Sequence, residues 1–194
     1  MSWAEIAGSI LGLINIVLLV RRSVWNFPVA MVMVSLIGFV LLGARLYSEA
    51  GLQVFFFVVN AYGWYLWSSA KDNEDEVPVA WMGWPARMAW ITGTAVCSLS
   101  LGWVMHRFTD AALPFADSAI AGASITAQFL LSFRKIENWV LWVLIDVASV
   151  TLYLSRGLNL FAALYVAFGV ISVIGLHEWM KAQKQQASLA QAFA

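Results

Sequence analysis

Charged residues divide this 194-residue chain into seven long apolar segments, and this division constrains the fold more than any other feature of the sequence. The segments lie at about 3–20, 27–44, 52–70, 88–105, 111–132, 138–154 and 158–179. Each is close to the ~20 residues that a helix needs to cross the hydrocarbon core of a bilayer. Lipid cannot satisfy backbone hydrogen bonds, and the ten-residue alternation of barrel strands is absent from runs such as 54–60. The sequence therefore predicts an all-α integral membrane protein with seven transmembrane helices.

Composition supports a membrane protein made of one unit. Hydrophobic residues form 62% of the chain and charged residues 11%, with a mean hydropathy of +0.79. Soluble domains ordinarily have about a quarter of their residues charged. Seven spans with short connections leave no room for a separate soluble domain. The first span lacks a basic n-region and a cleavage site, so we expect it to be retained rather than removed as a signal peptide.

A weak internal duplication relates the stretches 46–67 and 152–173. At a constant offset, identical residues fall opposite one another, as in the pairs Gly51 and Gly157, Phe55 and Phe161, and Gly63 and Gly169. We therefore expect a 3+1+3 layout, with repeat one at about 1–70, a linking helix at about 87–106 and repeat two at about 111–180. Many membrane transporters are built from two such repeats, with the substrate held between them near mid-membrane.

The distribution of basic residues predicts the orientation. Eight of the eleven Lys and Arg residues fall on one side of the predicted spans, and three fall on the other, namely Arg45, Arg107 and Arg156. Cytoplasmic loops carry the excess of positive charge. The N-terminus is therefore predicted to lie outside and the C-terminus in the cytoplasm.

In the third segment, Asn60, Trp64 and Trp67 fall at i, i+4 and i+7, which places an amide and two indoles on one helical face. Such a face could hold a flat ring. The alternative for Trp67, which lies near Lys71, is a place in the aromatic belt at the membrane interface. Asn60 lies deep in the span, where an unpaired amide is expensive, so it should face a cavity or another helix.

The sixth segment repeats this combination. Asn138, Trp142 and Asp146 are spaced i, i+4, i+8, and Trp139 lies beside Trp142 on an adjoining part of the surface. A carboxylate within a span is either functional or a buried hydrogen-bonding partner. Glu137 is expected to pair with the basic residues just before it, at the cytoplasmic interface.

The fifth segment carries Asp117, Ser124 and Gln128 on one face. Small residues at 121–123 run between them, and these would also serve close packing against a neighbouring helix. The same helix can carry both a polar stripe for a ligand and small residues for helix packing. We therefore retain Gln128 as a candidate site residue.

Several other function classes find little support. The chain has no Gly-rich phosphate loop, no HExxH motif and only two histidines, both near span ends. Cys97 is the only cysteine, which excludes an internal disulfide and does not support a thiolate metal site. We expect no enzymatic activity, no cofactor, no metal and no nucleic-acid partner. A non-transporting membrane scaffold stays open, although it has less reason to bury the four polar residues Asn60, Gln128, Asn138 and Asp146.

Three strings, LQVFFFVVNAYGWYLW, FADS and RKIENWVLWVLIDVASV, resemble the PnuC family of bacterial vitamin transporters over about residues 25–179. The best-known member carries nicotinamide riboside, and relatives carry thiamine or riboflavin. The resemblance implies a SWEET-like fold in the bacterial inner membrane and facilitated diffusion, with trapping of the vitamin by a cytoplasmic kinase. It also implies a homo-oligomer, as relatives form trimers.

The resemblance also implies site residues. The family's aromatic-and-amide motifs map onto Trp64, Trp67, Asn138, Trp139 and Trp142. Asp146 departs from the Asn of some relatives, and an ionised carboxylate there could favour a cationic ring, such as the pyridinium of nicotinamide riboside or the thiazolium of thiamine. A protonated, structural carboxyl group is the alternative. On physical grounds, and not from the resemblance, we expect Trp64 and Trp142 to stack the ring or attract its positive charge. Three amides would hydrogen-bond the ribose or the carboxamide, namely Asn60, Gln128 and Asn138.

Overall fold

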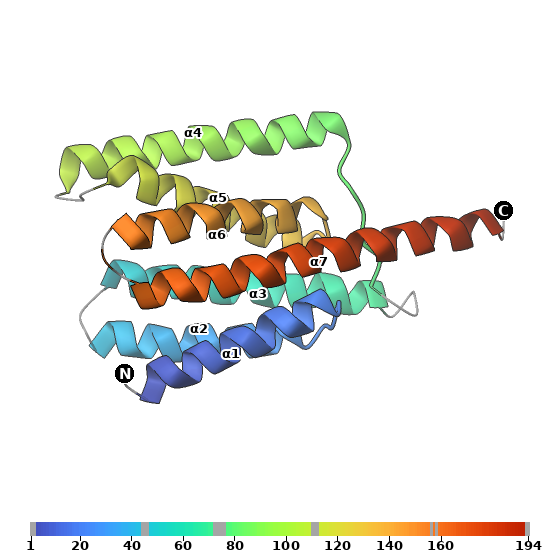
Figure 1. Ribbon diagram of the computed structural model, residues 1–194, viewed down its shortest axis with the longest axis horizontal. Coiled ribbons are helices and arrows are strands. Elements are labelled where there is room, and N and C mark those ends of the chain that lie inside the picture. Colours follow the sequence, from blue (N-terminus) through green and yellow to red (C-terminus); the bar gives the residue numbers. More distant parts are fainter. Residues whose placement is uncertain are drawn as a thin grey trace. The chain divides into compact units, whose positions relative to one another are not determined.

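A computed structural model of the protein describes residues 3–43, 47–71, 77–109, 113–155, 157 and 159–192. These residues form seven helices, and the predicted all-α fold is confirmed. The helices can be followed along the chain by their labels in Figure 1. The helices are α1 (Trp3–Val20), α2 (Asn26–Gly43), α3 (Tyr47–Lys71), α4 (Trp84–Phe108), α5 (Pro114–Ser132), α6 (Glu137–Ser155) and α7 (Asn159–Ala192).

The predicted segment ends lie within four residues of the helix ends except at two places. Helix α3 begins at Tyr47 rather than at about residue 52, and α7 continues to Ala192 rather than ending near residue 179. The residues added to α7 are mostly Ala, Gln and Lys, which favour helix strongly but together are too polar to register as an apolar segment. Hydropathy therefore locates the apolar part of a helix but not its full length.

Within the described residues, four helices have the length and apolar composition needed to cross a membrane. They are α2, α4, α6 and the Ala162–Leu189 part of α7. The described part of α1 adds a shorter apolar helix, Ile10–Val20. Helices α3 and α5 contain 25 and 19 residues, which is also long enough to span the hydrocarbon core. The chain is a multi-pass membrane protein.

The chain divides into two compact units. The first contains residues 1–79, 132–134 and 178–194, and so holds α1, α2, α3 and the last part of α7. The second contains residues 80–131 and 135–177, and so holds α4, α5, α6 and the first part of α7. In the first unit α1 packs on α2 and α2 packs on α3. The predicted 3+1+3 layout stays a prediction.

The same helix ending occurs twice in the chain. Arg22 follows α1 and Arg134 follows α5, and both adopt a left-handed backbone conformation, with φ of 54° and 59°. The Ser23 amide donates to the Leu18 carbonyl at 2.9 Å, and the equivalent bond 112 positions later measures 2.8 Å. A left-handed residue followed by such a bond is the Schellman ending, which satisfies the last carbonyls of a helix.

The helices that follow these turns also begin alike. Asn26 and Asn138 each donate a side-chain N–H to the carbonyl three residues earlier, at 2.7 and 2.6 Å. The next residues, Phe27 and Trp139, are both fully buried. Each asparagine therefore fixes the turn that directs an aromatic ring inward.

Each inward ring lies against a glycine. A Cβ on Gly63 would meet the ring of Phe27, and one on Gly175 would lie 2.5–2.6 Å from three ring atoms of Trp139. Four residues after these glycines come Trp67 and Trp179, both fully buried. Because these glycines have no side chain, the rings can lie close to α3 and α7.

These features set the register of the structural repeat at 112 residues, which differs from the register of the sequence alignment. That alignment paired Gly63 with Gly169 and Gly51 with Gly157. Gly51 lies inside α3, whereas Gly157 lies in the turn before α7 with φ of +72°. Because α7 carries glycines at 169 and 175, residue identity alone could not choose between them.

Gly175→Ala is expected to destabilise the protein by about 1–3 kcal/mol, because the added methyl group overlaps a fully buried indole that cannot move away. Thermal unfolding of the purified protein in detergent measures the effect. Gly93→Ala in α4 is the matched control, since nothing lies within 4 Å of its added methyl group, and helix propensity should make it neutral or stabilising. Equal behaviour of the two variants would contradict the packing described for Gly175.

Candidate functional site

Helix α6 presents most of its candidate residues on its buried face. Asn138 is fully buried, Asp146 is 4% exposed and Trp142 is half-buried. Ile145 and Ser149 are buried on the same face. The predicted i, i+4, i+8 stripe therefore lies toward the interior of the second unit, whereas Val147, on the other side of α6, is 62% exposed.

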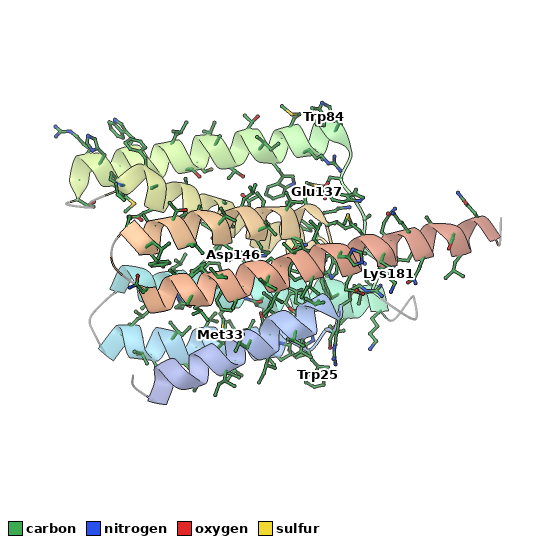
Figure 2. All side chains as sticks on the ribbon, viewed as in Figure 1. Trp25, Met33, Trp84, Glu137, Asp146 and Lys181 are labelled. Atoms are coloured by element: carbon green, nitrogen blue, oxygen red, sulfur yellow. The ribbon has the colours of Figure 1, made fainter. Side chains whose placement is uncertain are left out.

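Asp146 makes a buried hydrogen bond to α7. The Ser172 hydroxyl donates to its Oδ2 at 2.9 Å, and both side chains are buried. A Cβ on Gly169 would lie 3.4 Å from the Cβ of Asp146, so this glycine permits the close approach of α7. The position of Asp146 within α6 is visible in Figure 2.

Ser172 is a candidate site residue that the sequence analysis did not select. It reads in the sequence as one of several dispersed polar residues that join helices, and it does join α6 to α7. Its partner, however, is the candidate carboxylate. The sequence signal that could have identified Ser172 is its spacing from Gly169. Ser172 follows Gly169 by three residues, so the two lie on the same face of the helix.

Asn138 and Trp139 have structural contacts. The Asn138 side-chain nitrogen donates to the Lys135 carbonyl, while its Oδ1 is buried and accepts no hydrogen bond from the described residues. Trp139 packs against Gly175 of α7. Both residues hold the start of α6 in place, and their predicted contact with a ligand stays a prediction.

In the first unit the candidate residues of α3 occupy different environments. Asn60 is 4% exposed and donates to the Phe56 carbonyl of its own helix at 2.8 Å. Trp67 is fully buried and contacts two rings, those of Phe27 at 5.1 Å and Trp179 at 5.7 Å between centroids. Trp64 is 42% exposed. Trp67 is thus a packing residue of this unit and not a lipid-facing member of an aromatic belt.

Gln128 lies on the buried side of α5, at 8% exposure, while Ser124 and Asp117 are half-buried. The Ser124 hydroxyl donates to the Ile120 carbonyl of its own helix at 2.8 Å. Of the polar stripe predicted on α5, Gln128 is therefore the most deeply buried member.

The prediction that Glu137 pairs with the basic residues just before it is wrong. Its Oε1 pairs with Nε of Arg87 at 2.7 Å and accepts a hydrogen bond from the Met82 amide at 2.8 Å. The Ile136 amide donates to the Ala80 carbonyl at 3.2 Å, which brings the segment before α4 beside the start of α6. Proximity in the sequence favoured the preceding basic residues, whereas this tertiary contact supplies a closer cation.

The second unit combines three groups suited to a flat, positively charged ring. Trp142 and Asp146 lie one turn apart on α6, and Ser172 reaches the carboxylate from α7. An indole face attracts a cation, and a carboxylate within a span supplies opposite charge. The described residues contain no group of three or more His, Cys, Asp or Glu that could hold a metal ion.

Comparison with known proteins agrees with this reading of the fold. The model of the nicotinamide mononucleotide transporter family matches residues 2–181. The chain belongs to this family. The chain is also similar to the nicotinamide riboside transporter PnuC of Escherichia coli, at 31% identity over 98% of this chain and 90% of that protein. The resemblance to the PnuC family is therefore confirmed.

Two further relatives indicate the range of the family. The riboflavin/roseoflavin transporter RibM of Streptomyces davaonensis is 31% identical over 91% of this chain and 84% of its own length. The crystal structure of the vitamin B3 transporter PnuC matches with a TM-score of 0.75 at 24% identity, covering 95% of this chain and 83% of that one. That structural match shows that the two proteins share a fold.

Proposed function

We propose that this protein carries nicotinamide riboside across the bacterial inner membrane. The observation that carries the proposal is the 31% identity to the Escherichia coli nicotinamide riboside transporter over almost the whole of both chains. The all-helical, multi-pass architecture supports a transport function.

The chemistry of the second unit suits this substrate. The pyridinium ring of nicotinamide riboside is flat and positively charged. Trp142 can stack on such a ring or attract its charge, a contact worth about 0.5–2 kcal/mol depending on desolvation. Asp146 supplies the opposite charge, and Gln128 offers an amide for ribose or carboxamide. The predicted roles of Asn60, Trp64, Trp67, Asn138 and Trp139 in binding belong to the same proposal.

The sequence around Asp146 favours the riboside over its phosphorylated form. Helices α5 and α6 and the part of α7 up to His177 contain no Lys or Arg. A phosphate group is ordinarily bound by such cations or by bidentate Arg contacts. A mononucleotide would therefore bring its phosphate beside a carboxylate with no basic residue on these helices to neutralise it.

A preference for the riboside over the mononucleotide is what facilitated diffusion with trapping by phosphorylation requires. A cytoplasmic kinase that phosphorylates the riboside would convert it into a product that the transporter binds poorly, so uptake would continue without an ion gradient. The excess of Lys and Arg on one side supports an orientation with the N-terminus outside and the C-terminus in the cytoplasm. A homo-oligomer, such as the trimer that the resemblance implies, is part of the proposal.

Riboflavin is the second candidate substrate. The relative RibM, named as a riboflavin/roseoflavin transporter, is as similar to this chain as the Escherichia coli protein, at 31% identity. The isoalloxazine ring is flat but uncharged, so it would use the tryptophans without using the charge of Asp146. Thiamine, whose thiazolium ring is cationic, is an alternative that the resemblance leaves open.

Ligand-induced stabilisation tests the substrate. A ligand present at 100 times its dissociation constant stabilises a folded protein by about 2.7 kcal/mol. Nicotinamide riboside is expected to raise the thermal midpoint of the detergent-purified protein, and nicotinamide mononucleotide is not. Stabilisation by riboflavin or thiamine alone would reassign the substrate. A well-folded protein that none of these compounds stabilises would contradict the proposal.

A further inference from the structure

A cavity lies within the second unit, among α4, α5, α6 and the segment before α4. Its volume is about 690 Å³, and its lining is mostly apolar. Neither Trp142 nor Asp146 lines it. It is therefore a different site from the one proposed for the vitamin.

One end of the cavity is charged. Arg87 and Glu137 form an ion pair there, and the guanidinium lies 5.3 Å from the ring centroid of Trp81. Glu137 uses Oε1 for both the Arg87 contact and the Met82 amide. Its Oε2 is buried and has no hydrogen-bond partner among the described residues. The pair is neutral overall, yet it offers a free acceptor and the terminal N–H groups of a partly exposed arginine.

The cavity then runs along α4 away from the charged end. Thr94 contacts Thr126 hydroxyl to hydroxyl at 2.6 Å, and Ser98 follows, 9% exposed and with no partner for its Oγ among the described residues. The lining ends at Leu99 on α4 and Leu144 on α6. Polar groups thus become fewer with distance from the ion pair.

The length of the cavity corresponds to one leaflet. Leu99 lies twelve residues after Arg87, which is about 18 Å along a helix that rises 1.5 Å per residue. The hydrocarbon core of a bilayer is about 30 Å thick, so each leaflet contributes about half of that. Tryptophan and arginine at the charged end are typical of the membrane interface.

The geometry points to a binding site for a phospholipid whose headgroup carries both an ammonium and a phosphate group, namely phosphatidylethanolamine. The ammonium donates to the free Oε2 of Glu137, and the phosphate accepts from the terminal nitrogens of Arg87. One acyl chain lies along the cavity past Thr94 toward Leu99. Phosphatidylcholine has no N–H to donate, and phosphatidylglycerol would bring its negative charge to Glu137 without an ammonium.

Native mass spectrometry of the full-length protein tests the headgroup. The protein is released from detergent after incubation with equal amounts of phosphatidylethanolamine, phosphatidylcholine and phosphatidylglycerol of the same acyl composition. Phosphatidylethanolamine is expected to be retained at least threefold more than either competitor, and Glu137→Gln is expected to remove this preference. Equal retention of the three lipids, or a preference that survives Glu137→Gln, would overturn the proposal.

A second pair of variants tests the location and does not depend on the ion pair. Ala95→Phe places a ring in the cavity, and Val96→Phe adds the same bulk at the next position of α4, which does not line the cavity. Ala95→Phe is expected to lower phosphatidylethanolamine retention at least fivefold, with Val96→Phe unchanged and both proteins monodisperse. The same loss in both variants, or in neither, would exclude this cavity. A lipid-free dimer that Ala95→Phe dissociates would assign the cavity to a second copy of the chain and overturn the lipid proposal.

Discussion

Replacing Asp146 by Asn is expected to weaken binding of nicotinamide riboside by about 10–100-fold, or about 1.4–2.8 kcal/mol. The change removes a negative charge from a buried position while keeping the shape of the side chain. The remaining amide oxygen can still accept the hydrogen bond from Ser172, so packing of α6 on α7 should survive. At an effective dielectric of ~20, two opposite charges 4 Å apart attract by about 4 kcal/mol, which is enough to account for the loss.

An uncharged analogue of the substrate distinguishes an electrostatic role of Asp146 from a structural one. The reduced, dihydropyridine form of nicotinamide riboside has nearly the same outline but carries no positive charge. Calorimetric titration should show that Asp146→Asn affects this analogue less than threefold. Equal losses for the charged and uncharged compounds would assign Asp146 a structural role, with Ser172 as its packing partner. Ser172→Ala serves as the control that removes only the hydrogen bond.

Trp142→Ala is expected to reduce the affinity for nicotinamide riboside at least tenfold. The variant removes the stacking and cation–π contact, worth about 0.5–2 kcal/mol, together with the apolar surface that the indole buries against the ring. Because Trp142 is only half-buried, its truncation should cost less stability than truncation of the fully buried Trp139. Equilibrium binding to the purified protein measures the effect.

Two further variants control this experiment. Trp142→Phe keeps an aromatic face and should recover most of the affinity. Trp103→Ala removes an indole that is 59% exposed on α4 and belongs to no proposed site, so it should leave the affinity unchanged. Unaltered binding by Trp142→Ala would remove this residue from the site. The same loss in Trp103→Ala would show that the assay reports general damage.

The helices could be predicted from the sequence because lipid imposes a simple rule. Any span must be apolar and helical, so charge positions alone locate six of the seven helix starts within a few residues. The polar end of α7 follows a different rule. It is helical because its residues have high helix propensity, a preference that hydropathy does not measure.

Tertiary partners were harder to predict than helices. The stripe Asn138, Trp142 and Asp146 follows from helical periodicity, and the structure places it toward the interior. The hydrogen bond from Ser172 to Asp146 depends on how α7 lies against α6, and a sequence gives no direct measure of that. The same reason explains Glu137, which pairs with Arg87, fifty residues earlier in the chain.

Equivalent positions of the structural repeat carry different residue types, so comparison of residue identities does not find them. Phe27 and Trp139 occupy equivalent positions over equivalent glycines, but they differ in type. The sequence alignment was chosen to place the largest number of identical residues opposite one another, and this offset paired Gly63 with Gly169 rather than with Gly175. Backbone conformation and burial identify the equivalence, because packing constrains the space that a residue fills more strongly than its chemical identity.

Counterflow in proteoliposomes tests the proposed function most directly. Purified protein is reconstituted without ion gradients, the vesicles are loaded with unlabelled nicotinamide riboside, and uptake of the labelled compound is followed with unlabelled nicotinamide riboside, thiamine or riboflavin as competitors. We predict transient accumulation that only nicotinamide riboside competes away. Folded protein that accumulates no nicotinamide riboside, while exchanging thiamine or riboflavin under the same conditions, would contradict the assignment.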